Sequence, residues 1–580
     1  MSEIKEKASI VNSKNRIIII GGIAAGTSAA VKARRKSEDA RITIYEKYKY
    51  ISYGTCGLPY FVSGKITDID NLIINTVRQF EQRFNIKVNI MHEVINIDSK
   101  EKSILAKNLI SGEQFKDYYD KLIIATGSTS IIINPELESA PNCFSLRTID
   151  DALRLKEYLV SLVKEYDPEG QNKTVVNKPL RAIIIGGGFI GLEILDAFLH
   201  KSLNITIVEK TGQILPAFDF EIIEYLENYL AGNGIVLRKE ESIENFEKNA
   251  DGKIISLKTS NGDKLVCDII FQSAGTKPDS KLAGNCGIVI GKSGAISVDE
   301  YLVTSEPDIY AAGDCCECKN FVTQIKQAYN LASIANIQGR CAGYNAAGGK
   351  DKFIDSIPTS IIKVLDIAIG KTGISLKEAR NHGIDAAKIE LHYPSHAGYY
   401  PGASLIHMLV IYDRISGVIL GFEAIGRESV DKKVDVMSVA IRARMKIWDL
   451  VNLNLSYHPE YGSAKDSINI LGMIGENIKK GEYRQMDVEE LKDMIKNKQD
   501  IRILDVRTKR EFDMGHIDGA FNISVDELRG NLDKLDRNSK IVVHCRTSYR
   551  SYLAYLILKN SGFKNVWNLN GSYLSWIRKI

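Results

Sequence analysis

Two cysteines lie in surroundings that suit sulfur chemistry. Cys56 lies in the segment 52–60, and the next cysteine along the chain is Cys143. A redox dithiol needs two cysteines a few residues apart, so Cys56 can bond only to a group from outside the protein. That group would be a small-molecule thiol, a sulfane sulfur atom, or an oxygen atom in a sulfenic acid. The second, Cys545, follows an apolar segment at 541–543.

A glycine-rich turn precedes Cys56. The apolar segment 16–20 reads as a buried parallel strand, and residues 21–26 then form the turn. A helical stretch over 27–35 leads to a second strand, 41–45, which is followed by Glu46. Such a turn lets the backbone approach a pyrophosphate at a helix N-terminus, and the acid reaches ribose hydroxyls. The segment predicts a dinucleotide site.

The same pattern returns later in the chain. A strand over 181–185 runs into the turn 186–191, a helix is expected from Leu192, and the strand 205–208 is followed by Glu209. This turn fits the G-x-G-x-x-G frame fully, whereas Ile23 occupies the middle glycine position of the first turn. Two such units predict two dinucleotide sites.

Glu209, the acid that follows the second glycine turn, indicates which nicotinamide nucleotide is bound. A carboxylate at Glu209 would accept a hydrogen bond from a free 2′-hydroxyl and repel a 2′-phosphate. NADH is therefore favoured over NADPH, although Lys210 beside it leaves NADPH open.

The first site is expected to hold a flavin. Asp314 ends the short strand and turn 310–314, where it can hold a ribityl hydroxyl, and the strand 122–127 leads to a turn typical of the border between flavin and nicotinamide domains. We therefore expect FAD first and NAD(P)H second. The residues predicted to bind these cofactors are Gly21, Gly22, Ala24, Ala25, Gly26, Glu46, Lys47, Thr126, Gly127, Arg147, Asp314, Gly186, Gly188, Phe189, Ile190, Gly191, Glu193, Glu209 and Gly275.

Composition narrows the class of protein. The net charge of +4 argues against a general nucleic-acid role. Neither a run of 18 or more apolar residues nor an N-terminal apolar signal region occurs, so no membrane span is expected. The 9 cysteines are scattered, which favours a reducing, cytoplasmic compartment. Cys315, Cys316 and Cys318 lack a second ligand pair at metal-site spacing, and no metal is expected.

The predicted fold is α/β, with several domains. They comprise two Rossmann-like dinucleotide-binding domains, an α+β dimerisation domain and a C-terminal α/β domain. The expected bounds are a flexible tail at 1–14, an FAD domain at 15–149 and 276–350, an NAD(P)H domain at 150–275, a dimerisation domain at 351–470, a linker at 471–485 and a final domain at 486–580.

From Arg16 to about Asp466 the chain resembles the two-dinucleotide-binding flavoprotein disulfide reductases. The specific resemblance is to coenzyme A disulfide reductases, whose single cysteine lies in S-x-x-x-C-[AG]-L-P-Y; related NADH oxidases and peroxidases differ after the cysteine. The resemblance implies a homodimer formed through residues 351–470. It also implies that Tyr399 and Tyr457 of a partner subunit reach the cysteine, where a hydroxyl could donate to the departing sulfur. The alternative role for both tyrosines is packing.

The resemblance also implies coenzyme A contacts. Ser28, Lys32 and Arg35 are spaced so that they share one face of the first helix. By family match this face meets coenzyme A, together with Ser52, Asn330 and Lys465. The alternative is a solvated helix edge, because lysine and arginine are usually exposed.

The segments 504–507 and 511–520 lead to Cys545, and together they make 486–580 closely resemble a single rhodanese domain. In that family the cysteine, here Cys545, lies in a cradle of loop amides that favours its thiolate and holds a persulfide. Four residues separate Cys545 from Arg550, whereas phosphatases with a similar cradle use five, so sulfur is favoured over phosphate. Ser548 occupies a position where glycine is common, which affects the expected loop shape and donor preference.

As a whole the chain resembles the coenzyme A disulfide reductase–rhodanese fusions, also described as NADH-dependent persulfide or polysulfide reductases. The implied activity is NADH- and FAD-dependent reduction of coenzyme A disulfide, coenzyme A persulfide or polysulfide through Cys56, with sulfane sulfur delivered by Cys545 directly or through a carrier. Two alternatives stay open. The first is an NADH oxidase or peroxidase that cycles Cys56 through sulfenic acid; the second is a non-catalytic, sulfur-sensing tail.

Overall fold

The computed structural model describes residues 15–166 and 179–578, and it divides into two compact units. The first unit runs to Lys210 and resumes over Glu240–Pro358, and the second comprises Thr211–Lys239 and Thr359–Ile580. The predicted tail at 1–14 lies outside the described residues.

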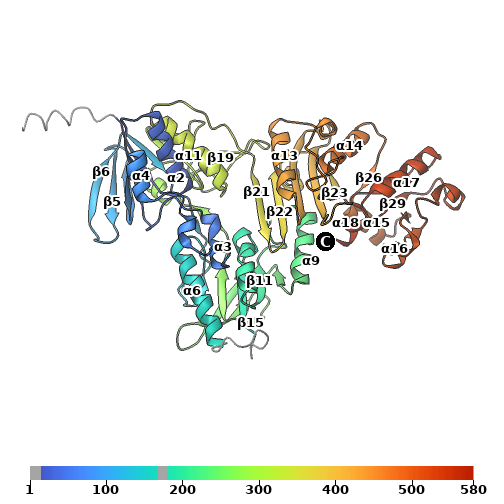
Figure 1. Ribbon diagram of the computed structural model, residues 1–580, viewed down its shortest axis with the longest axis horizontal. Helices are drawn as coiled ribbons and strands as arrows, with labels where there is room; N and C mark the ends of the chain where they lie inside the picture. Colours follow the sequence, from blue (N-terminus) through green and yellow to red (C-terminus); the bar gives the residue numbers. More distant parts are fainter. Residues whose placement is uncertain (1–14, 167–178, 579–580) are drawn as a thin grey trace, which may run out of the picture. The chain divides into compact units, whose positions relative to one another are not determined.

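The first unit begins with a five-stranded sheet whose neighbouring strands are all parallel. Its order is β18 (Ile309–Ala311), β7 (Lys121–Ile124), β1 (Arg16–Ile20), β2 (Arg41–Glu46) and β3 (Lys87–Ile90). Helix α2 (Ala24–Lys36) packs closely on α11 (Ala332–Ala346), since a Cβ on Gly339 would lie 2.2 Å from the Ala25 oxygen. This packing fixes the N-terminus of α2 at Ala24, within the predicted turn 21–26 and before the expected helix start at residue 27 (Figure 1).

A second parallel sheet and two antiparallel ones complete this unit. The parallel strands run in the order β11 (Asn204–Glu209), β10 (Arg181–Ile185), β16 (Ile269–Gln272) and β9 (Cys143–Phe144). The antiparallel sheets are β4–β6 (His92–Asp98, Ser103–Asn108, Gln114–Tyr118) and β13–β15 (Ile243–Lys248, Ile254–Thr259, Lys264–Val266). The helix expected from Leu192 begins earlier, as α7 (Phe189–Glu193) followed by α8 (Leu195–Leu199). Helix α6 spans Ile149–Tyr166.

The second unit contains an antiparallel five-stranded sheet. Its order is β21 (Thr359–Val364), β22 (Ile367–Gly373), β25 (Ile419–Gly426), β24 (Leu405–Asp413) and β23 (Ala386–Pro394). Helices α9 (Phe220–Gly232), α12 (Leu376–Asn381) and α13 (Val430–Arg442) pack on it. Helix α14 (Ser467–Lys479) occupies the first half of the segment predicted as a linker, 471–485.

The last sheet of the second unit is parallel and carries Cys545. Its order is β26 (Gln485–Met486), β30 (Val566–Leu569), β29 (Ile541–His544), β27 (Arg502–Asp505) and β28 (Phe521–Asn522). Its helices are α15 (Val488–Lys496), α16 (Lys509–Asp513), α17 (Tyr549–Asn560) and α18 (Ser572–Ile577). Cys545 follows β29, the central strand of this sheet, directly.

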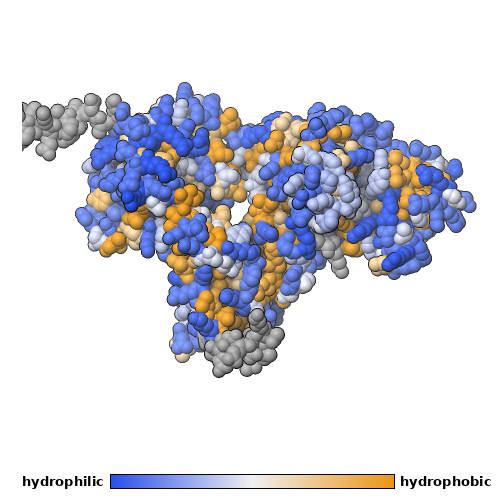
Figure 2. Space-filling model, viewed as in Figure 1, coloured by the Kyte–Doolittle hydropathy of each residue, from blue (hydrophilic) through white to orange (hydrophobic). Residues whose placement is uncertain are grey.

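The visible surface is mainly hydrophilic, with apolar groups between charged ones (Figure 2). Exposed apolar residues include Ile361 and Val439 of the antiparallel sheet and its helix α13, where the dimer contact is predicted. Within the described residues, no helix combines the length and apolar character that crossing a membrane requires.

Candidate functional site

The first glycine turn has the shape of a nucleotide cradle. Gly21 has a φ of +107°, and a Cβ there would lie 2.2 Å from the Ala125 oxygen, so only glycine fits. The buried Glu46 carboxylate accepts hydrogen bonds from the amides of Gly22 at 2.7 Å and Tyr48 at 2.9 Å. Burial raises the pKa of Glu46. A turn that begins with two glycines, beside a fixed acid, fits the predicted FAD diphosphate and ribose.

A polar chain leads to the other predicted flavin contact. Arg147 donates to Ser128 Oγ at 2.7 Å, and Ser128 Oγ donates to the Asp314 carboxylate at 3.1 Å. Burial raises the pKa of Asp314, and its carboxylate has acceptor sites left for a donor such as a ribityl hydroxyl. Thr126 is held in place by donating to the Asp279 carbonyl at 2.6 Å. Sequence reasoning missed Ser128 and Asp279, which belong to no recognisable motif.

The second turn repeats the geometry of the first. Gly186 has a φ of +101°, and a Cβ there would lie 2.4 Å from the Ser273 oxygen. The Glu209 carboxylate accepts from the Gly187 amide at 2.8 Å, as Glu46 does in the first turn. Glu209 therefore lies beside the turn, where its charge can act on the adenosine ribose of a nicotinamide dinucleotide.

Glu209→Gln tests this assignment with little change of shape. The amide oxygen of glutamine can still accept from Gly187, but the negative charge that repels a 2′-phosphate is gone. We expect the ratio of kcat/KM for NADH to that for NADPH to fall about tenfold, or about 1.4 kcal/mol in transition-state binding. Steady-state kinetics with both nucleotides measure it, with Glu244→Gln on exposed β13 as control. An unchanged ratio would contradict the role of Glu209.

Cys56 lies on a short 3₁₀ turn, Thr55–Gly57, directly before helix α3 (Leu58–Val62). It is exposed, and all nine cysteines, which lie within the described residues, are free thiols. Although part of the residue is exposed, its sulfur is partly desolvated by the surrounding protein. This desolvation, and then the negative charge of Glu193, raise the pKa of Cys56. Cys56 thus has no disulfide partner within the chain, as its spacing predicts.

Glu193 and Tyr60 form a pair beside Cys56. Burial raises the pKa of Glu193 to about 7, and the Tyr60 hydroxyl donates a hydrogen bond to its carboxylate. Glu193 is predicted as a cofactor contact, but its pairing with Tyr60 is not evident from sequence because the two residues lie on different helices, α7 and α3.

The two predicted tyrosines lie together in the second unit. The hydroxyls of Tyr399 and Tyr457 are 2.9 Å apart, and both side chains are exposed. The hydrogen bond to Tyr399 raises the pKa of Tyr457. The fold thus brings together two hydroxyls from residues 58 positions apart, and either one can donate to a thiolate. Their contact with Cys56 of a partner subunit stays a prediction.

The predicted coenzyme A face on α2 lies partly against α11. Ser28 donates to Asn336 at 2.6 Å, and the Lys32 ammonium lies 4.9 Å from the centre of the Tyr344 ring. Arg35 is exposed. The remaining predicted contacts are Ser52, which is buried, and Asn330 and Lys465, which are exposed. Coenzyme A binding at these residues stays a prediction.

The loop after Cys545 is fixed by an ion pair. Arg550 makes two hydrogen bonds to the Glu511 carboxylate, both 2.7 Å long, and this pairing lowers the pKa of Glu511 to about 2. Arg550 is therefore fixed at the start of α17, and its predicted catalytic role stays a prediction. Ser548 has a φ of +81°, the left-handed conformation that explains why glycine is common there. The main chain keeps this shape despite the serine.

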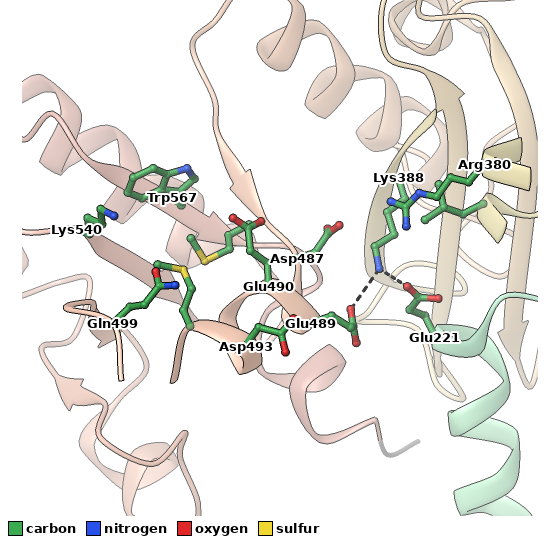
Figure 3. A pocket seen from close by; sticks show the side chains of 13 residues that line it. Glu221, Arg380, Lys388, Asp487, Glu489, Glu490, Asp493, Gln499, Lys540 and Trp567 are labelled. Atoms are coloured by element: carbon green, nitrogen blue, oxygen red, sulfur yellow. Dashed lines mark hydrogen bonds and ion pairs between the residues drawn. The ribbon is translucent and has the colours of Figure 1, made fainter. Parts of the chain in front are cut away.

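A cavity of about 640 Å³ lies elsewhere in the second unit (Figure 3). Its lining is mostly charged: Glu221, Arg380, Lys388, Asp487, Glu489, Glu490, Asp493 and Lys540 contribute. Lys388 forms ion pairs with Glu221 and Glu489 across it. None of the predicted site residues lines this cavity in the described part of the chain. The same described residues hold no group of three or more His, Cys, Asp or Glu that could bind a metal.

Comparison with known proteins identifies three domains. Residues 15–339 match the pyridine nucleotide-disulphide oxidoreductase family, 359–467 match the dimerisation domain of these oxidoreductases, and 487–579 match the rhodanese-like domain. The predicted fold class and the predicted flavoprotein–rhodanese resemblance are confirmed, and with them an enzyme that uses FAD and a nicotinamide nucleotide.

Two solved structures match nearly all of this chain. Reduced Bacillus anthracis CoADR-RHD is 33% identical with a TM-score of 0.91, covering 97% of this chain and 98% of its own. An NAD-dependent persulfide reductase from A. fulgidus is 34% identical with a TM-score of 0.87, covering 97% of this chain and 100% of its own. A curated NADH oxidase from Methanocaldococcus jannaschii is 30% identical over 78% of this chain and 97% of its own length.

Proposed function

The chain belongs to the pyridine nucleotide-disulphide oxidoreductase family, and from this premise we propose that it uses NADH and FAD to reduce sulfur–sulfur bonds of coenzyme A through Cys56. The observation that carries the proposal is the exposed Cys56 thiol with no disulfide partner in the chain. The similarity to CoADR-RHD and to a persulfide reductase supports a substrate in which a thiol carries sulfur, either as disulfide or as persulfide.

The proposed reaction has two stages. The Cys56 thiolate attacks the coenzyme A sulfur of a coenzyme A persulfide, the sulfur–sulfur bond breaks, and the leaving sulfur departs as hydrosulfide. With coenzyme A disulfide the leaving group is coenzyme A thiolate. Either route leaves a mixed disulfide between Cys56 and coenzyme A. Two electrons from NADH, supplied through FAD, and one added proton then return the Cys56 thiol and free coenzyme A. A hydroxyl of the Tyr399–Tyr457 pair can donate to the departing thiolate.

We further propose that Cys545 loads the substrate. Its thiolate takes the outer sulfur from a persulfide donor and releases the donor thiolate. Coenzyme A thiolate then attacks the outer sulfur on Cys545, giving coenzyme A persulfide and restoring the Cys545 thiolate. This exchange needs no oxidant or reductant, since each step moves one sulfur atom between thiolates.

Cys545→Ala separates the two activities. We expect reduction of coenzyme A disulfide to stay within about twofold of wild type, while sulfide release from a bulky persulfide donor falls at least about tenfold. NADH oxidation without air and sulfide assays measure the two rates, with the partly exposed Cys286→Ala as control. Equal loss on both substrates would contradict the relay. A change in reductase control without any sulfurtransferase activity in wild type would instead favour a sulfur-sensing tail.

The relation to an NADH oxidase supports a second candidate, in which Cys56 cycles through sulfenic acid. The two functions differ in stoichiometry: an oxidase consumes oxygen with NADH under air, whereas a sulfur reductase releases sulfide or thiol without air. Mass spectrometry of the purified protein adds a direct test, because a coenzyme A adduct on Cys56 is expected only for the sulfur reductase.

A further inference from the structure

Ser572 occupies a strained position beside Cys545. It begins helix α18, is completely buried, and has a φ of +59° next to Gly571, whose φ is +66°. A non-glycine residue in this left-handed conformation raises the free energy of the fold, and glycine would remove that cost. Backbone strain of this kind is concentrated at functional sites, and Ser572 lies beside the reactive cysteine. The Ser572 side chain is therefore a candidate for a role at Cys545.

The Ser572 hydroxyl faces the Cys545 sulfur. The Cys545 amide donates to Ser572 Oγ at 3.1 Å, and Ser572 Oγ donates to Cys545 Sγ at 3.9 Å. A second buried hydroxyl, Ser551 Oγ, lies 3.2 Å from Ser572 Oγ and 3.0 Å from the Ser548 carbonyl, and its single hydrogen can go to only one of these two oxygens. A hydroxyl has one hydrogen and two acceptor sites, so Ser572 can accept from the amide while its hydrogen points at the sulfur.

The start of α18 is itself tied to the cysteine loop. The Tyr573 amide donates to the Cys545 carbonyl at 3.0 Å, and the Leu574 amide donates to the Arg546 carbonyl at 3.2 Å. The helix N-terminus therefore cannot shift without moving the loop, and the Ser572 hydroxyl keeps its place relative to the sulfur.

We propose that Ser572 is a positioning residue that stabilises negative charge on Cys545 Sγ. This inference rests on the proposed sulfur-carrying role of Cys545. When coenzyme A thiolate takes the outer sulfur, the sulfur–sulfur bond breaks and its electron pair returns to Sγ. The hydroxyl then donates to a charged sulfur, a stronger hydrogen bond than to a neutral one, and the distance shortens. When Ser551 turns its hydrogen from the Ser548 carbonyl to Ser572 Oγ, it strengthens the Ser572 hydroxyl as a donor to the sulfur.

Ser572→Gly tests the proposal because it should not lower the stability of the fold but should lower the reactivity of Cys545. The melting temperature is expected to stay the same or rise, since glycine suits the backbone. Iodoacetamide alkylation of Cys545, followed by peptide mass spectrometry across a range of pH, is expected to need a pH about one unit higher for the same rate. Transfer of sulfur from a loaded Cys545 persulfide to cyanide in a single turnover is expected to slow about tenfold.

Ser572→Ala also lacks the hydroxyl and should show the same alkylation and transfer changes at a lower melting temperature. Ser575→Ala is the matched control on α18, because the Ser575 hydroxyl lies 3.0 Å from His392 Nε2 and not at the loop. It should leave alkylation of Cys545 unchanged even if it lowers stability. An unchanged alkylation profile in folded Ser572→Gly and Ser572→Ala overturns the role of Ser572. If wild-type Cys545 alkylates normally but never carries a persulfide, the proposed function fails instead.

Discussion

Cys56→Ser is expected to abolish NADH-dependent reduction of every sulfur substrate, with turnover at least about 10³-fold lower. A serine hydroxyl is not ionised near neutral pH and cannot form the mixed disulfide on which the proposed reaction depends. FAD content should not change, because the glycine turn and the Asp314 chain that fit FAD do not involve Cys56. NADH oxidation and product thiol, both measured without air, give the result.

The matched control for that variant is Cys286→Ser, which changes another free cysteine with some solvent exposure. It should keep reductase activity within about twofold of wild type. Retained sulfur reduction in Cys56→Ser would remove Cys56 from the mechanism. Retained oxygen consumption with lost sulfur reduction would show that oxygen reacts without the cysteine, and would also exclude a sulfenic acid cycle.

The local patterns of the chain were strong enough to predict the two nucleotide turns. Gly21 and Gly186 are required by backbone contacts that any side chain would block, and the acids Glu46 and Glu209 end the strands next to them. These features repeat at fixed spacing, so sequence alone reveals them. The fold class follows from the same repetition of strand, turn and helix.

Other parts of the site depend on contacts between distant residues. Glu511 holds Arg550 across 39 positions, and Ser572 reaches Cys545 across 27. Nothing in the local sequence of a serine or glutamate distinguishes such a partner from a surface residue. The positive φ of Ser572 could not be predicted from sequence either, because serine rarely adopts this conformation.

The same limit applies to the buried charges of the second unit. Lys388 and Glu390 are two positions apart on β23, so their side chains lie on the same face of the strand. Both side chains are almost fully buried, and their Nζ and Oε1 atoms lie 3.0 Å apart. Glu221 from α9 and Glu489 from α15 also pair with Lys388. One lysine therefore connects the antiparallel sheet, a segment from the middle of the chain and the rhodanese-like domain. Burial opposes ionisation of Glu390, but Lys388 overcomes it and lowers the pKa of Glu390.

Lys388→Met should therefore destabilise the second unit by about 3–5 kcal/mol, because among the described residues it leaves the buried Glu390 with only the His407 ring, 3.4 Å away, as a partner that can carry positive charge. In wild type the depressed pKa means that Glu390 adds stability above its unfolded pKa and loses it as the pH falls. Without Lys388, burial raises that pKa, so stability is instead lost as the pH rises. The loss should be larger at about pH 8 than at about pH 5, as calorimetric unfolding of the full chain can measure.

Two further variants decide whether the buried charge is the cause. Lys388→Met combined with Glu390→Leu removes both charges and should recover most of the lost stability, since an apolar pair of similar volume can replace a buried ion pair. Lys509→Met removes an exposed lysine that pairs with Asp513 at 2.5 Å, and it should cost less than about 0.5 kcal/mol. If the double variant were no more stable than Lys388→Met, the loss would come from missing packing and not from an uncompensated carboxylate. The stability loss of Lys388→Met would then also be the same at about pH 5 and about pH 8, because ionisation of Glu390 would not be its cause.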